Sequence, residues 1–95
     1  MEKTFTYLAQ FRGGTYCTQV KAKDVTDSLA AWIENLGREK TQIKHLGEKV
    51  LAELATEIAD GDNNPLPLND LKNVWCICFA TRKGFWLVNI VQTVT

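Results

Sequence analysis

The chain has one histidine, His45, and only three cysteines among its 95 residues. Nucleophilic catalysis needs a serine or cysteine beside a base that a third group orients, and no such spacing surrounds His45. A structural zinc site takes four ligands, which Cys17, Cys76 and Cys78 together with that histidine do not offer at the usual spacing. The sequence therefore predicts no catalytic residues, no metal and no cofactor, and hence a protein that is not an enzyme.

The chain also lacks long apolar runs and paired cysteines. No stretch approaches the ~18 apolar residues of a membrane span, and the first residues have no apolar segment typical of a signal peptide. An odd number of cysteines beside a hydrophobic content of 45% is typical of reduced thiols rather than of a disulfide framework. We therefore expect a cytoplasmic protein without a membrane partner; any redox role of Cys76 and Cys78, which share one face of a strand, stays open.

Net charge is absent as well, because eleven basic residues balance eleven acidic ones. Aromatic residues on a predicted sheet are typical of platforms on which RNA bases stack, but such platforms are flanked by basic residues. Here Arg12, Lys21, Arg82 and Lys83 cluster near turns and strand ends. We therefore expect no nucleic-acid partner.

The first segment of the chain predicts a β-hairpin that is apolar on one face. Residues 4–12 and 15–22 alternate between apolar and polar side chains, and Arg12-Gly13-Gly14-Thr15 is a hairpin turn signal. Folding about this turn pairs Phe11 with Tyr16 and Tyr7 with Val20. The opposite face carries mostly polar residues, which is typical of a solvated surface.

Two helices and a loop are predicted in the middle of the chain. Asp24 has the position of an N-cap, and Gly37 that of the residue that follows a helix. A second helix is expected from Leu46 or Glu48 to Ala59, ended by Gly61. Residues 61–70 contain both prolines and many turn formers, so we predict a loop within one domain that spans residues 1–95.

The last hairpin comprises residues 74–81 and 85–93, joined by a two-residue Lys83-Gly84 turn or by a three-residue turn that contains a bulge, and it is apolar on both faces. One face carries Trp75, Ile77, Phe79, Trp86, Val88 and Ile90. The other carries Val74, Cys76, Cys78, Ala80, Phe85, Leu87, Asn89 and Val91. This excess of apolar surface is the best functional indication in the sequence, because large exposed apolar patches usually mark an interface.

These elements predict an α+β two-layer sandwich of order ββααββ, with a four-stranded, mainly antiparallel sheet and two helices. If both helices pack on one face, the other face of the second hairpin is bare. The alternative is that one helix or the proline-containing loop crosses to the far face and covers it within the chain.

Residues 5–36, with their strands, Gly-Gly turn and helix Asp27-Ser28-Leu29-Ala30-Ala31-Trp32, are loosely similar to the opening of HicB-type antitoxins. The resemblance covers about a third of the chain and departs from the family at its third strand, which is missing before the helix. We therefore do not assign the chain to that family. Small size and an apolar face also suit the inhibitor half of a toxin and immunity pair, an analogy of architecture alone.

The leading hypothesis is a non-enzymatic domain that binds protein through an apolar face of its sheet, either as a homodimer or with another partner. Large aromatic side chains dominate interface energies, so the second hairpin supplies the candidate residues. They are Trp75, Ile77, Phe79, Phe85, Trp86, Leu87 and Asn89. Two alternatives stay open: an antitoxin or immunity-type inhibitor, and a small ligand-binding protein or enzyme with a pocket between sheet and helices.

Overall fold

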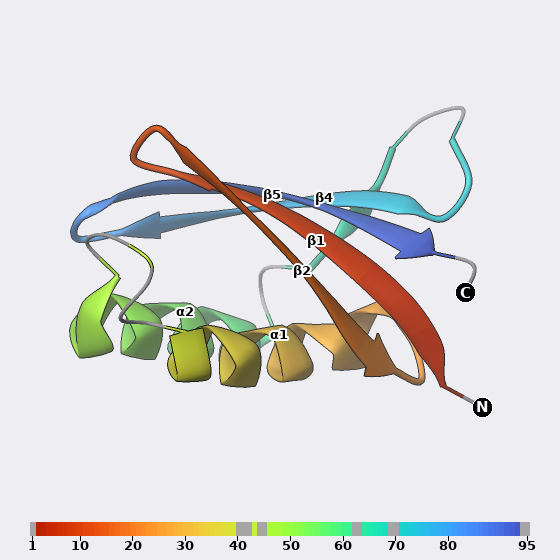
Figure 1. The fold of residues 1–95 in the computed structure, drawn as a ribbon, viewed down its shortest axis with the longest axis horizontal. Helices are drawn as coiled ribbons and strands as arrows, with labels where there is room; N and C mark the ends of the chain where they lie inside the picture. The colour runs from red at the N-terminus through yellow and green to blue at the C-terminus, as the bar shows by residue number, and fades with distance from the viewer. Residues whose placement is uncertain (1, 40–42, 44–45, 62–63, 69–70, 94–95) are drawn as a thin grey trace.

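The computed structural model of the chain describes residues 2–39, 43, 46–61, 64–68 and 71–93, and consists of a β-sheet layer and a helix layer. The helices lie side by side beneath the sheet, and no helix crosses to its upper face in the described part of the chain (Figure 1). The elements in chain order are β1 (Lys3–Phe11), β2 (Gly14–Ala22), α1 (Val25–Glu39), α2 (Gly47–Asp60), β3 (Leu66–Pro67), β4 (Val74–Thr81) and β5 (Gly84–Thr93). The α+β class and both helices are as predicted from sequence.

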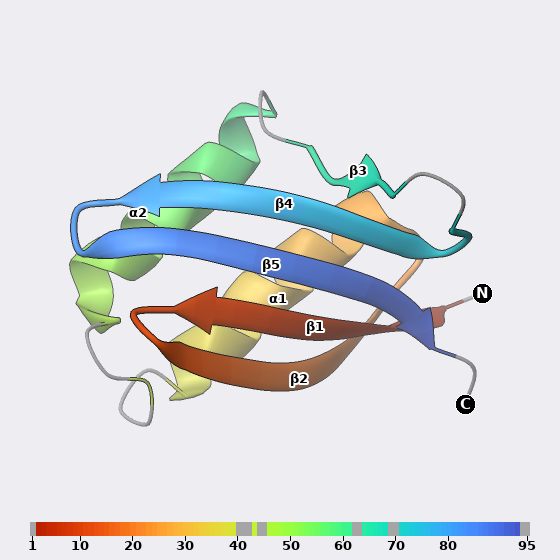
Figure 2. The same ribbon diagram turned by 90° about the horizontal axis from the view of Figure 1, so that it is seen from above.

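The sheet has five strands in the order β2-β1-β5-β4-β3, and every pairing is antiparallel (Figure 2). The prediction of four strands in the order ββααββ was therefore wrong by one strand, β3. This short strand lies inside the proline-containing loop, where Leu66 pairs with Cys76 and the Leu68 N–H donates to the Val74 carbonyl at 3.1 Å. Pro67, which has no N–H to donate, lies opposite Trp75 between these two pairs, so it costs the ladder no hydrogen bond.

The turn of the first hairpin lies one residue earlier than the sequence predicted, which shifts the pairing of its two strands by two residues. Arg12 and Gly13 occupy the turn with φ angles of 50° and 82°, the signature of a type I′ turn, and Phe11 pairs with Gly14. Tyr7 consequently faces Thr18 rather than Val20. A shift of two residues leaves every side chain on its predicted face, because the side-chain period of a strand is two.

The second hairpin shows the same offset. Its turn is Arg82-Lys83 rather than Lys83-Gly84, and Thr81 pairs with Gly84. The Arg12 guanidinium donates to the Lys83 carbonyl at 2.6 Å and so joins the two turns. The two predicted sets of faces are retained.

Helix α1 begins as predicted but extends further. The Asp24 carboxylate accepts a hydrogen bond from the Asp27 N–H at 2.8 Å, which satisfies one of the free donors at the helix start. The prediction that Gly37 follows the helix was wrong, because α1 continues to Glu39. A Cβ placed on Gly37 would contact Leu51 of α2 at 3.5 Å, so this glycine lies at the contact between the helices.

Helix α2 matches its predicted bounds within about one residue, allowing for the fraying of helix ends. Gly61 ends it in the left-handed conformation, with φ of 73°, and its N–H donates to the Ile58 carbonyl. The predicted helix-entry residue His45 lies outside the described residues.

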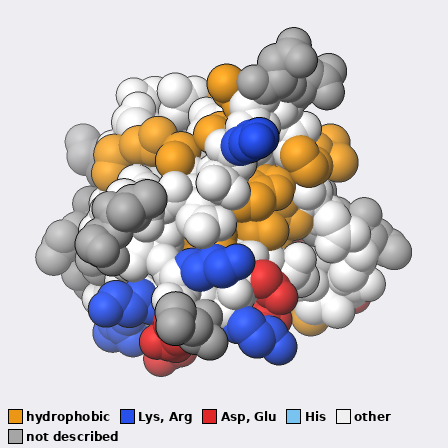
Figure 3. Space-filling model, turned by 90° about the vertical axis from the view of Figure 1, so that its right-hand side faces the viewer, with side chains coloured by type: hydrophobic (Ala, Val, Ile, Leu, Met, Phe, Trp, Pro, Cys, Tyr) orange, Lys and Arg blue, Asp and Glu red, His pale blue; other side chains and the backbone are white. Residues whose placement is uncertain are grey.

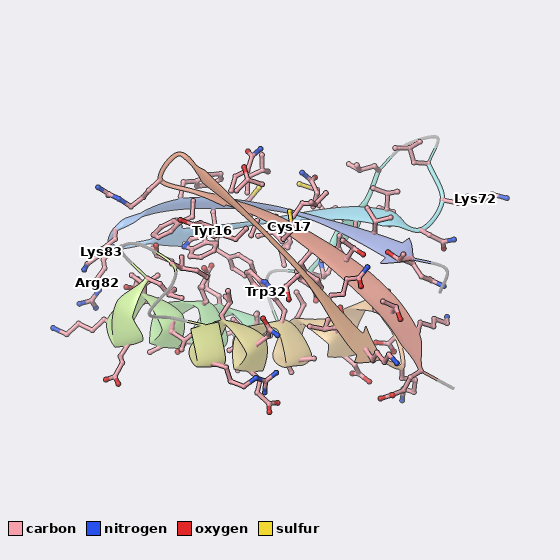
Figure 4. All side chains as sticks on the ribbon, in the orientation of Figure 1. Tyr16, Cys17, Trp32, Lys72, Arg82 and Lys83 are labelled. Atoms are coloured by element: carbon pink, nitrogen blue, oxygen red, sulfur yellow. The ribbon has the colours of Figure 1, made fainter. Side chains whose placement is uncertain are left out.

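The core fills the space between the two layers, with Trp32 of α1 at its centre (Figure 4). The Trp32 ring stacks on Tyr7 with a centroid distance of 5.1 Å and meets Trp86 edge-on at 6.0 Å. Tyr7 donates its buried hydroxyl hydrogen to Ser28 Oγ at 2.6 Å, because the Ser28 hydroxyl itself donates to the Val25 carbonyl. Aromatic packing of this kind fixes the sheet on α1.

Candidate functional site

The upper face of the sheet is the candidate site, because both helices lie on the other side. Side chains of alternate residues point to opposite faces of a strand. On β4 and β5 the helix-facing set includes the buried Ile77, Phe79 and Trp86, whereas their neighbours in sequence face away from the helices. We call this side the uncovered face.

The seven candidate residues from the sequence do not form one surface. Ile77, Phe79 and Trp86 are at most 3% exposed and belong to the core beneath the sheet. Half-buried Trp75 is on the same side, with its ring 6.0 Å from that of Phe5. These four are therefore not placed for a partner on the uncovered face, because α1 and α2 cover their side of the sheet.

The remaining three candidates, Phe85, Leu87 and Asn89, lie together on the uncovered face along β5. Phe85 is 61% exposed, a large value for a phenylalanine. Strands β1 and β4 flank β5, so further apolar side chains surround these three residues. We define the apolar patch as Leu8, Leu66, Val74, Cys76, Cys78, Phe85, Leu87 and Val91.

Of the residues in this patch, the sequence analysis named only Phe85 and Leu87 as candidates. It missed the other six, which are Leu8, Leu66, Val74, Cys76, Cys78 and Val91. Along β5, the parity that groups Phe85 with Leu87 also selects Val91, and the predicted two-residue turn adds Val74, Cys76 and Cys78 to this face, so part of the signal was present in the sequence. Leu8 joins them only because β1 pairs with β5, a long-range pairing that periodicity does not give. Leu66, which is 68% exposed, belongs to the strand that was not predicted.

The uncovered face carries very little charge. Among the described strand residues that point to it, Lys21 at the end of β2 is the one charged side chain. Polar residues occupy β2 and much of β1, while the apolar patch spans β5 and β4. Seen from the end at which both termini lie, the visible Asp and Glu side chains are in the lower half, toward the helices, whereas Lys and Arg side chains appear in both halves (Figure 3).

Asn89 is a polar residue surrounded by the apolar patch. Its position on β5 lies between Leu8 of β1 and Cys76 of β4, in the middle of the sheet. Its side-chain amide makes no hydrogen bond to any of the residues that the structure describes. Two donors and an acceptor are therefore available to a molecule seated on this face.

The cysteines all lie on the uncovered face, and Cys17 points away from the helices (Figure 4). Burial, and then the neighbouring Cys78 thiol, raise the pKa of the Cys76 thiol above its usual value. A raised pKa lowers the fraction of reactive thiolate at neutral pH. Within the described ranges, no three His, Cys, Asp or Glu side chains lie close enough to hold a metal ion.

The hollows that the described residues line are on the surface. One of about 400 Å³ lies between α2 and the end of β4, beside an ion pair of 2.6 Å between Glu53 and Arg82. Another of about 460 Å³ is lined by Gln10, Phe85, Leu87 and the first turn, so it continues the apolar patch toward the hairpin ends. Core side chains occupy the space between sheet and helices, where the ligand-pocket alternative would place its site.

No family model, curated protein or solved structure matches the chain. None of the described helices has the length and apolar character needed to cross a membrane. Functional inference therefore rests on the uncovered face itself.

Proposed function

We propose that the protein is a non-enzymatic protein-binding domain that self-associates through the apolar patch on the uncovered face of its sheet. The observation that carries this proposal is the combination of exposed Phe85 and Leu66 with a face that neither helix covers. Contiguous apolar surface of this kind is uncommon on isolated monomers and usually marks an interaction site.

A second copy of the chain suits this face because a two-fold interface brings the same surface of each molecule together. A face rich in one charge would repel its own copy, whereas Lys21 is the one charged side chain among the described strand residues that point to this face. Two sheets stacked face to face interdigitate their apolar side chains about 10 Å apart. Asn89 near the centre supplies amide groups that can pair across the axis and fix the register.

Replacing Leu87 with aspartate tests the proposal. Leu87 is half-buried on the uncovered side of β5, the middle strand of the sheet, so a carboxylate there stays partly solvated in the free chain but is desolvated in a face-to-face contact. Loss of a central contact is expected to cost about 2 kcal/mol or more, which weakens association about 30-fold. Native mass spectrometry over a concentration series should show the oligomer mass falling by half.

The matched control is Ala52→Asp, which adds the same charge to an exposed position of α2 in the helix layer. It should leave the oligomer mass unchanged, and circular dichroism should show both variants folded. A wild-type protein that stays monomeric up to high micromolar concentration would overturn self-association. A monomer that carries a co-purified small molecule would instead favour the ligand-binding alternative.

A further inference from the structure

The outer edge of strand β2 is a second surface on which a partner could bind, because its outward backbone groups are not paired with another strand of the sheet. β2 is one end of the sheet, pairs with β1 over nine residues in unbroken register and contains no proline or bulge. Edge strands of this length are usually shortened, bulged or covered, because their free N–H and C=O groups can pair with another strand. Within the described residues β2 is neither shortened, bulged nor covered, and its one charged residue, Lys21, lies next to its end.

The hairpin geometry determines which backbone groups of β2 point outward. Phe11 and Gly14 flank a two-residue turn and form a hydrogen-bonded pair, and such pairs alternate along an antiparallel ladder. The ladder to β1 therefore uses Gly14 and every second residue to Ala22. The N–H and C=O groups of Thr15, Cys17, Gln19 and Lys21 point away from the sheet, and none of them has a hydrogen-bond partner among the described residues.

We propose that β2 pairs antiparallel with β2 of a second copy of this chain, joining two sheets into one of ten strands. The two-fold axis passes beside Thr18, the middle residue of the strand. In this register Cys17 lies opposite Gln19 of the second copy and Thr15 lies opposite Lys21. A register centred on Cys17 or on Gln19 would leave part of the outward row without a partner residue in the strand.

Charge and packing support this occupant. Lys21 is the one charge in the outward row, and the antiparallel arrangement keeps the two lysines at opposite ends of the pairing, each beside a neutral threonine. α1 lies beneath β2, where Asn35 accepts a hydrogen bond from the Thr18 hydroxyl at 3.2 Å. The side chains of the outward row point to the uncovered face, away from the helix layer.

Edge pairing is separate from the face-to-face contact proposed above, because one lies in the plane of the sheet and the other above it. The test therefore uses the full chain with Leu87→Asp, which weakens the face contact and leaves β2 intact. We expect this protein to remain a dimer in native mass spectrometry. Adding Cys17→Pro should weaken that dimer at least about tenfold, since the variant removes the same outward N–H from both copies.

The matched control is Cys17→Val, which keeps the N–H and a side chain suited to a strand, and it should remain dimeric. A Leu87→Asp protein that is monomeric at all concentrations, or a folded Cys17→Pro variant that dimerises normally, would overturn edge pairing. The first of these results would leave the face contact in place. A Leu87→Asp protein that keeps the full wild-type mass would instead count against the face contact.

Two measurements keep the test valid if Cys17→Pro does not fold. Amide hydrogen exchange of the wild type should slow at Thr15, Cys17, Gln19 and Lys21 as the oligomer forms; rapid exchange there at concentrations that give an oligomer would refute the pairing. The variant Gln19→Cys places a thiol directly opposite Cys17 of the second copy, at a Cα separation of about 5.5 Å that suits a disulfide. Mild oxidation should give covalent dimers of this variant, and failure to do so would refute the register.

Discussion

Replacing Trp86 with alanine removes one of the largest side chains in the core. Trp86 is fully buried, stacks on Phe11 with a centroid distance of 4.1 Å and meets Trp32 edge-on. Burying a tryptophan removes about 150–250 Å² from water, which is worth about 4–6 kcal/mol at 25 cal/mol per Å². A substantial loss of stability is therefore expected.

The buried indole N–H of Trp86 reduces the loss of stability expected for Trp86→Ala. The Trp86 Nε1 hydrogen is buried and has no acceptor among the described residues. A buried donor without a partner costs about 1–3 kcal/mol, and alanine relieves that cost. We therefore expect Trp86→Ala to lower the free energy of unfolding by about 3 kcal/mol, the middle of the ~1–5 kcal/mol that these two ranges span. Trp86→Phe, which keeps a ring on Phe11 and removes the donor, should cost only about 0–1.5 kcal/mol.

Urea unfolding followed by circular dichroism measures these differences, at concentrations at which the protein is monomeric. Phe85→Ala is the matched control, because Phe85 is the preceding residue and points to the uncovered face. It should change the free energy of unfolding by less than about 1 kcal/mol. Equal losses for Trp86→Ala and Phe85→Ala would refute the assignment of the two faces of β5.

Two further predictions concern the helix layer and its link to the sheet. Burial raises the pKa of Tyr7 well above its usual value of 10.0. As the pH rises, the unfolded chain therefore releases this proton before the folded chain does. The contribution of Tyr7 to stability is fully present below about pH 10 and should fall as the pH rises above it. Urea titrations at about pH 9 and pH 11 should show a smaller fall in the free energy of unfolding for Tyr7→Phe than for the wild type. Gly61→Ala should lower the free energy of unfolding by about 1–2 kcal/mol, because alanine is strained at the left-handed φ of 73°; a thermal melt with no loss would contradict this view of the α2 terminus.

Periodicity predicted the faces of both hairpins correctly but not their registers. Alternate residues of a strand point to opposite faces of the sheet. Phe85 therefore shares one face with Leu87, and Trp86 shares the other with Val88, whichever turn is used. The choice of turn depends on which residue accepts a positive φ. In the first hairpin the sequence predicted that Gly13 and Gly14 occupy the turn, because glycine accepts a positive φ. In the structure Arg12 takes the first turn position, with φ of 50°.

Other differences come from contacts between segments far apart in the chain. A glycine at position 37 is typical of a residue that ends a helix, but in the structure Gly37 lies inside α1. There it packs against Leu51 of α2. β3 has only the two residues Leu66 and Pro67 and forms because β4 offers an edge to them. The candidate site was only partly predictable for the same reason: both faces of the last hairpin are apolar, and the side that the helices cover is decided by tertiary packing.

The two edges of the sheet are treated differently, and this difference limits how far any assembly through edges can grow. At β4, Leu66 and Pro67 cover one end of the strand, and the Glu53 carboxylate accepts the Arg82 N–H at 3.2 Å at the other. A sheet open at both sides would add copies without end and form fibres. With β4 guarded and β2 open, the proposed pairing through β2 would use the available edge of each copy, so assembly through edges would end at two copies.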